Sequence, residues 1–271
     1  MLISVKHKTQ YSYEEEAAYT IQSLRLTPRS FVGQNIISWK ITAPGRDKAL
    51  MFSDSFGNQV HTITISEPHN KVVIVAEGTV ETQDTNGVVN GLNDIAPSSV
   101  FLRGTQMTKA SSDIRELAGN SLKDDTLSTL HELNHVILDK VEYERGVTSS
   151  KTNASEAFEL GKGVCQDHTH IFIAAARTLG IPARYITGYL VSDDEDAEAH
   201  HAWAEVYVHN LGWVGFDVSN QLCPTENYVR LSCGLDASDA APVRGAFQGG
   251  EDESLDVSVE VQQQQQTQSQ E

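Results

Sequence analysis

Cysteine and long apolar runs are the scarcest features of this 271-residue chain. It has three cysteines, Cys165, Cys223 and Cys233, which do not make a disulfide framework. No apolar stretch approaches the length that crosses a bilayer, and residues 1–6 lack the pattern of a signal peptide. These features exclude the disulfide-rich secreted and membrane-spanning classes. We therefore expect a cytoplasmic protein without a membrane partner, where the reducing environment preserves free thiols.

Positive charge is also scarce. Lys and Arg number 20 against 37 Asp and Glu, which gives a net charge of −17. Such a chain repels phosphate backbones, so we do not expect a nucleic-acid partner. An acidic run occupies residues 193–196, followed by Glu198. A solvated loop explains this run most simply; the alternative is that it biases a nearby cleft towards cationic substrates.

The length of the chain predicts two domains. Residues 1–90 contain segments rich in Val, Ile and Thr with period-two alternation, which predicts an antiparallel β-sandwich without catalytic residues. The predicted strands are residues 2–13, 36–43, 60–66 and 71–80. Residues 84–97, with Asn-Gly twice, are expected to form the linker.

The second part of the chain, residues 98–250, is predicted to form the catalytic core of an α+β protein. Helices are expected at residues 111–118, 123–140 and 166–179, the last ending at Gly180 and Pro182. Alternating apolar residues predict one more strand over residues 253–262. The glutamine-rich residues 263–271 cannot bury apolar area and are expected to be disordered.

Cys165 is the first candidate for chemistry. It follows Gly161 and Gly163, which let the backbone turn sharply, and it stands at the predicted start of a helix. Unpaired amide hydrogens and the helix dipole favour a thiolate there. The alternative is a small buried cysteine with no chemical role.

His201 and Asp217 supply the two other groups that a cysteine nucleophile needs, a base and a carboxylate that orients it. They lie on two alternating segments that predict a hairpin with its turn near residues 209–212. A tight turn centred between Asn210 and Leu211 would put the two side chains on opposite faces of the sheet. We therefore predict a longer loop or a bulge at this turn. The neighbouring His200 would point to the other face, and we expect it in a loop at the rim of the cleft.

A second motif competes with this interpretation. His131-Glu-Leu-Asn-His135 matches the helical H-E-x-x-H pattern of zinc peptidases. A third ligand would have to come from elsewhere, and Glu156 or Glu159 have no feature that favours them. We interpret His131 and His135 as surface residues of a structural helix. Cys165, His168 and His170 also cluster, but they span more than half of a helix circumference and suit a shared ion poorly.

Several short motifs resemble those of the transglutaminase-like cysteine hydrolases of bacteria. They are GVCQD at residues 163–167, LGIPARY at 179–185, HAWAEVY at 201–207 and GFD at 215–217. LRLTPR at 24–29 and FGN at 56–58 resemble the N-terminal domain that often precedes this core. The resemblance covers nearly the whole chain except its glutamine-rich end. His168 departs from the family, which commonly has an apolar aromatic residue at that position, whereas His170 matches it.

The resemblance implies a papain-like site, with a nucleophile that begins a helix packed on an antiparallel sheet. Cys165 would be the nucleophile, His201 the base and Asp217 the orienting acid. The implied reaction is cleavage of a peptide or protein amide through a thioester. The Cys165 amide is a candidate oxyanion donor, and Gln166 and Trp203 are candidates for oxyanion or substrate contacts.

Two other functions stay open at this point. One is a transglutaminase that transfers the acyl group to an amine, and the other is a binding module without catalysis. The intact Cys, His and Asp argue against the binding module. We expect no metal or organic cofactor, and the sequence does not predict an oligomeric state.

Overall fold

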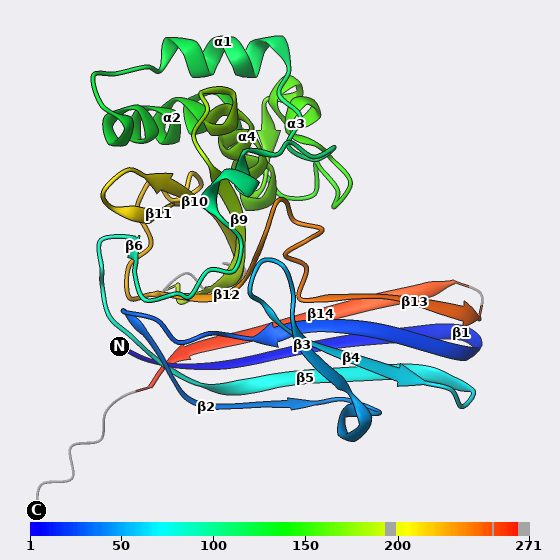
Figure 1. The fold of residues 1–271 in the computed structure, drawn as a ribbon. Helices are drawn as coiled ribbons and strands as arrows, with labels where there is room; N and C mark the ends of the chain where they lie inside the picture. The colour runs from blue at the N-terminus through cyan, green and yellow to red at the C-terminus, as the bar shows by residue number, and fades with distance from the viewer. Residues whose placement is uncertain (193–198, 251, 265–271) are drawn as a thin grey trace, which may run out of the picture.

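The computed structural model describes residues 1–192, 199–250 and 252–264. It consists of two lobes, a large β-sheet lobe and a lobe in which four helices pack on a second sheet (Figure 1). This confirms the predicted α+β class with antiparallel sheets. Within the described residues, no helix is long and apolar enough to cross a bilayer.

The first lobe is a strongly curled antiparallel sheet. Its strand order is β2-β5-β1-β4-β3, and two further strands from the C-terminal end of the chain also pair with β1. The alternating burial along β1 places one row of its side chains in the core of the lobe. The strands are β1 (Leu2–Thr27), β2 (Gln34–Thr42), β3 (Leu50–Ser53), β4 (Gln59–Ile65), β5 (His69–Thr82), β13 (Val243–Gly249) and β14 (Glu253–Gln263), with a short 3-10 helix at Arg46–Lys48.

β1 continues well beyond the predicted strand at residues 2–13. The prediction stopped there because the alternation ends at three glutamates, Glu14, Glu15 and Glu16. In the structure these residues are exposed, at a shift of register between β1 and β5 that lies between Ser12 and Ala17. Beyond the shift β1 pairs with β4 and β13. A strand can carry exposed charges at such an irregularity without leaving the sheet.

The C-terminal part of the chain returns to this first sheet. β14 spans the segment predicted as a last strand, and it pairs with β1 from Ile3 to Tyr13. β13 was not predicted as a strand and belongs to the first sheet, although its residues fall in the segment that we assigned to the catalytic core. Of the glutamine-rich end, residues 265–271 lie outside the described residues.

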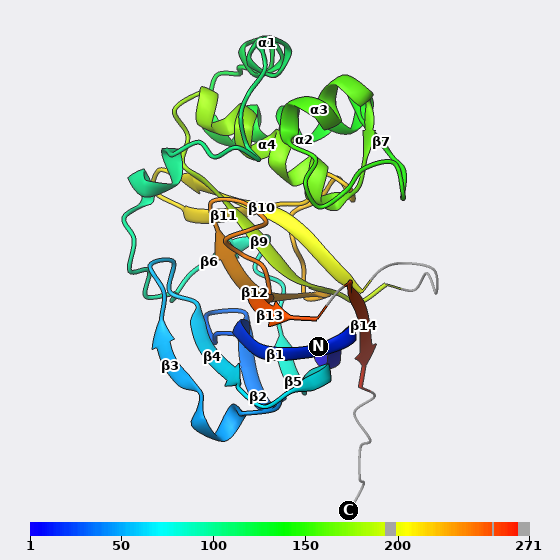
Figure 2. The ribbon, with the colours of Figure 1, turned by 90° about the vertical axis from the view of Figure 1, so that its right-hand side faces the viewer.

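The second lobe has the sheet order β12-β9-β10-β11-β6. Its helices cover the side of this sheet that faces away from the first lobe (Figure 2). β6 lies in the predicted linker and pairs with β11. The elements are β6 (Val88–Val89), a 3-10 helix at Ser98–Leu102, α1 (Ser112–Asn120), α2 (Thr126–Lys140), β7 (Glu142–Tyr143), α3 (Ala154–Leu160), β8 (Lys162–Gly163), α4 (Cys165–Thr178), β9 (Ala183–Leu190), β10 (His200–Val208), β11 (Gly212–Phe216) and β12 (Tyr228–Gly234).

α4 is the central helix of the second lobe and is almost entirely buried. It begins at Cys165, as predicted. The carboxylate of Asp167 accepts the Val164 backbone N–H at 2.9 Å and the Thr148 hydroxyl at 2.7 Å, which fixes the helix start. The chain leaves the helix at Gly180, whose φ of 74° favours glycine.

Two side-chain amides of the first lobe fasten it to β12, the edge strand of the second sheet. Gln34 donates to the Arg230 carbonyl at 2.9 Å and accepts the Arg230 N–H at 2.7 Å. Asn58 bonds in the same way to both backbone groups of Cys233, at 2.7 and 2.9 Å. Both amides satisfy backbone groups that an edge strand would otherwise leave unpaired, so they cover this edge as a neighbouring strand would.

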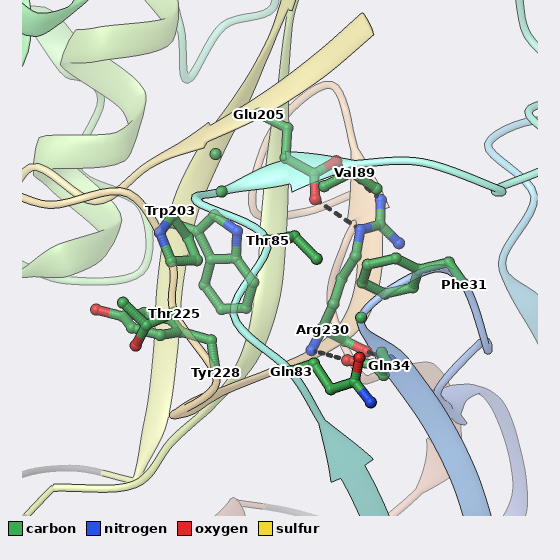
Figure 3. Close-up of a pocket in the computed structure, with 14 residues that line it drawn as sticks. Phe31, Gln34, Gln83, Thr85, Val89, Trp203, Glu205, Thr225, Tyr228 and Arg230 are labelled. Atoms are coloured by element: carbon green, nitrogen blue, oxygen red, sulfur yellow. Dashed lines mark hydrogen bonds and ion pairs between the residues drawn. The ribbon is translucent and has the colours of Figure 1, made fainter. Parts of the chain in front are cut away.

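A buried ion cluster lies beneath the second sheet. Glu205 accepts Arg230 Nε at 2.7 Å (Figure 3). It also accepts Arg184 Nε at 2.6 Å. Asp94 pairs with the same Arg184 at 3.0 Å, and the guanidinium lies 3.9 Å from the ring centroid of Trp213. Two cations thus face two anions, and the attraction of both arginines lowers the pKa of Glu205 against the opposing effect of burial.

Replacing Glu205 by glutamine is expected to destabilise the fold strongly, because Arg184 and Arg230 would keep their charges in a dry site. Breaking one partner of a buried pair costs about 3–5 kcal/mol. Urea unfolding of Glu205→Gln measures the loss, with Glu116→Gln on the exposed side of α1 as the matched control. Equal stability of the two variants would contradict the structural role of this cluster.

Candidate active site

The hairpin of β10 and β11 sets the register of the site. Ala204 pairs with Phe216 and Val208 with Gly212, which leaves a three-residue loop at residues 209–211. Asn210 turns the chain with a φ of 69°. The predicted longer loop is confirmed, and its consequence is that the side chains of His201 and Asp217 share one face.

His201 and Asp217 are in direct contact. Nε2 of His201 donates to Oδ2 of Asp217 at 2.6 Å, and both side chains are buried. The Asp217 Oδ2 atom also accepts Asn220 Nδ2 and the Tyr228 hydroxyl, each at 2.7 Å. Burial would raise the pKa of Asp217, but the His201 charge and these hydrogen bonds outweigh it and lower the pKa.

Cys165 lies close enough to the same imidazole to raise its pKa. Because Nε2 of His201 is bonded to Asp217, Nδ1 is the nitrogen left for the thiol. The pairing of β10 with β11 covers Ala204 to Val208, so His201 lies beyond it and its ring can face the start of α4. Burial would lower the pKa of His201, but Asp217 and Cys165 together raise it above its ordinary value.

His200 is the first residue of β10 rather than a loop residue, which corrects our expectation. Its side chain points to the face opposite His201, as the alternation of a strand requires. The ring lies 5.9 Å from that of His7, in the first lobe. Burial, followed by the charge of His201, lowers the pKa of His200 to about 4.

The two candidates for oxyanion or substrate contacts occupy different places. Gln166 lies in the first turn of α4 and lines a large cavity together with Tyr185. Trp203 does not line that cavity. It is buried between His201 and Tyr228, at ring centroid distances of 6.4 and 5.4 Å, beside a smaller cavity (Figure 3). Trp203 therefore supports the imidazole by packing, and Gln166 is the candidate with access to a substrate.

The remaining histidines of α4 have structural partners. Nε2 of His168 donates to the Val141 carbonyl and Nδ1 accepts the Ser219 hydroxyl, both at 2.9 Å. His170 accepts the Ala237 N–H at 3.1 Å. Both rings are buried, which lowers their pKa values and favours the neutral imidazole.

The residues of the H-E-x-x-H motif lie on the exposed side of α2, as expected. His131 packs against the ring of Phe216 at 5.2 Å, and His135 contacts Gln221 at 3.2 Å and Asp139 at 3.4 Å. Within the described residues, no group of three His, Cys, Asp or Glu side chains could hold a metal ion. The acidic run at residues 193–196 and Glu198 lies outside the described residues.

Sequence reasoning missed the residues that hold the acid in place. Asn220 and Tyr228 both bond to Asp217, and Asp167 caps the helix that carries Cys165. The short spacing from Asp217 to Asn220 is a weak signal of a local turn. No local sequence pattern connects Tyr228 to this site. Tyr228 lies on β12, an edge strand of the second sheet that is separated from β10 by β9.

Cys165 is expected to be the single fast-reacting thiol. Cys233 is 2 % exposed, and burial raises the pKa of the Cys223 thiol. Alkylation by iodoacetamide, followed by peptide mass spectrometry, should modify Cys165 at least about tenfold faster than the other two. Equal rates at the three thiols of the native protein would contradict this expectation.

Comparison with known proteins agrees with this geometry. Residues 115–218 match the transglutaminase-like superfamily, and residues 3–81 match the bacterial transglutaminase-like N-terminal region. The chain belongs to the transglutaminase-like superfamily. All three motifs that carry Cys165, His201 and Asp217 fall within the first of these matches.

Similar proteins cover nearly the full chain. An uncharacterized protein of Mycobacterium leprae (strain TN) is 28 % identical over 278 residues, which are 94 % of this chain and 96 % of the relative. An uncharacterized protein of Mycobacterium tuberculosis (strain ATCC 25618 / H37Rv) is 27 % identical over 94 % of this chain and 91 % of its own. The crystal structure of a candidate cysteine protease from Cytophaga hutchinsonii has a TM-score of 0.77 at 24 % identity, over 97 % of this chain and 90 % of the other.

The superfamily and this shared fold support a cysteine-dependent hydrolase or transferase. They do not specify the reaction, which has to be inferred from the residues of the site.

Proposed function

We propose that the protein is a cysteine-dependent peptidase or amidase that acts through a thioester on Cys165. The observation that carries the proposal is the position of His201, which is bonded to Asp217 through Nε2 and lies close enough to Cys165 for the thiol to raise its pKa. This arrangement keeps a proton on the imidazole next to the thiolate, which is the form that attacks an amide.

The reaction follows from the two protonation states of His201. The Cys165 thiolate attacks the amide carbon and forms a tetrahedral oxyanion. His201 then gives its proton to the leaving amine, and the C–N bond breaks to leave the thioester. In the second half, neutral His201 takes a proton from water, the hydroxide attacks the thioester, and the thiolate leaves. Asp217 holds the imidazole in the orientation that both halves require.

The start of α4 supplies the oxyanion donor in this proposal. The first amides of a helix have no intrahelical partner, so the Cys165 N–H is available. The Gln166 side chain, on the cavity side of the same turn, is our candidate for a second donor. Free thiols at all three cysteines fit the reducing cytoplasm in which we propose that the protein works.

Acyl transfer to an amine is the alternative outcome of the same thioester. The proposal of a hydrolase is tested by incubating the protein with a library of activated peptide amides and measuring its intact mass. We expect an acyl adduct that maps to Cys165, disappears in Cys165→Ser and persists in the control Cys223→Ser. An adduct on any other residue would contradict the proposal, and chase of the adduct by an added amine in preference to water would favour the transferase.

Metal removal separates this proposal from the zinc-peptidase alternative. We expect a chelator to leave activity and melting temperature unchanged, because His131 and His135 have protein partners on an exposed helix face. Atomic absorption of the purified protein provides the second measurement. Stoichiometric zinc that is lost together with activity in His135→Ala would show that a zinc site carries the reaction.

A further inference from the structure

A cavity of about 590 Å³ lies beside Cys165, between the two lobes. Gln166, the residue after Cys165, and Tyr185, within electrostatic range of Cys165, both line the wall. The first lobe contributes another part of the wall. Its residues there include His7, Thr9 and Tyr11 of β1, and Leu255 and Val257 of β14. The N-terminal sheet therefore builds part of the cavity at Gln166, the residue next to Cys165, although neither Cys165 nor His201 is among the wall residues.

The charge of this wall is opposite to that of the protein. Lys151, in the loop before α3, and Arg244, on β13, both line the cavity. None of the described wall residues is an Asp or Glu, although acidic residues outnumber basic ones 37 to 20 in the chain. The two cations come from different lobes, so the cavity brings them together only in the folded protein.

Among the described residues, four carboxylates act on wall residues without lining the cavity: Asp167 and Asp236 act on Tyr185, Glu253 on Tyr11, and Asp239 on Arg244. Asp239 lies within electrostatic range of Arg244 but accepts the Leu235 N–H at 3.3 Å. Glu253 is hydrogen-bonded to Tyr13, near the middle of β1. Because none of the four lines the cavity, Lys151 and Arg244 are the charged side chains of its described wall.

The two histidines in the wall add hydrogen-bonding groups rather than charge. Burial lowers the pKa of His7 to about 3, and that of His200 to about 4. Both are neutral at pH 7, so the charge comes from Lys151 and Arg244. Nε2 of His200 is buried and has no hydrogen-bond partner among the described residues. The aromatic and aliphatic residues of the wall suit a carbon chain between these polar groups.

We propose that this cavity binds the acyl part of the substrate and selects an apolar acyl chain that carries a carboxylate. The inference rests on the proposed function, because the chain must be delivered to Cys165. Opposite charges inside a partly enclosed cavity attract more strongly than at an open surface, and salt weakens that attraction.

Three p-nitrophenyl esters of similar size test the charge preference. They are the monoester of glutarate, which is anionic, the pentanoate, which is neutral, and the γ-trimethylammoniobutyrate, which is cationic. The burst of p-nitrophenolate gives the acylation rate constant, corrected for background with Cys165→Ser. We expect the anionic ester to react about tenfold faster than the neutral one, with the preference falling at high salt.

Charge-reversal variants test whether Lys151 and Arg244 of the cavity wall cause this preference. Lys151→Glu and Arg244→Glu should each reduce the ratio of anionic to neutral rates, whereas Lys109→Glu, an exposed lysine of the same lobe outside the cavity, should leave it unchanged. Equal bursts with all three esters, or a faster burst with the cationic ester, would overturn the inference and leave the thiol chemistry intact. The absence of a burst with every ester would instead contradict the proposed function, and the inference with it.

Discussion

His201→Ala is expected to abolish almost all acylation of Cys165. The substitution removes both the group that holds the proton next to the thiolate and the group that delivers it to the leaving amine. A positioned acid–base residue contributes about 10² to 10⁴-fold. The measurement is single-turnover acylation with an activated amide, read as the rate of formation of the thioester.

His200→Ala is the matched control for this prediction, because the two histidines are adjacent on β10 but point to opposite faces. We expect its acylation rate constant at saturating substrate to stay within about tenfold of the unmodified protein, since its ring lies beside His7 rather than Asp217. An active His201→Ala together with an inactive His200→Ala would show that the base has been assigned to the wrong face of the sheet.

Asp217→Asn is expected to lower activity and to move its pH dependence. The corresponding change in a serine protease costs about 10⁴-fold, and we expect a smaller loss because Cys165 and His201 can form an ion pair without the acid. Asp217 raises the pKa of His201, so in the unmodified protein the imidazolium persists above neutral pH. Without that carboxylate, burial still lowers the pKa of His201, and the proton leaves at lower pH. The alkaline limb of kcat/KM should therefore shift to lower pH.

Tyr228→Phe distinguishes the charge of Asp217 from its hydrogen bonds. It removes the hydroxyl that donates to Oδ2 at 2.7 Å but keeps the carboxylate. We expect its alkaline limb to stay close to that of the unmodified protein. Identical pH profiles for Asp217→Asn and the unmodified protein would contradict the role that we assign to this carboxylate.

The hairpin of β10 and β11 shows how far local patterns lead. Alternation along two segments predicted the strands, and the requirement that His201 and Asp217 share a face predicted a loop longer than a tight turn. The prediction depends only on the period of two in a strand. By contrast, the same alternation predicted too early an end for the first strand, before Glu14. In a sequence, exposed charged residues at a register shift have the same pattern as a loop.

The sequence by itself determined the candidate cysteine at the start of a helix, the candidate histidine and aspartate at the two sides of a hairpin, and the superfamily, since each depends on residues close together in the chain. Only the tertiary structure decided what surrounds them. Tyr228 reaches Asp217 from a strand at the edge of the sheet, and β13 and β14 return to the first lobe to complete the cavity beside Cys165. Lys151 and Arg244 line this cavity from different lobes. Such contacts join residues far apart in the sequence, and they follow from packing and strand pairing, which no local pattern encodes.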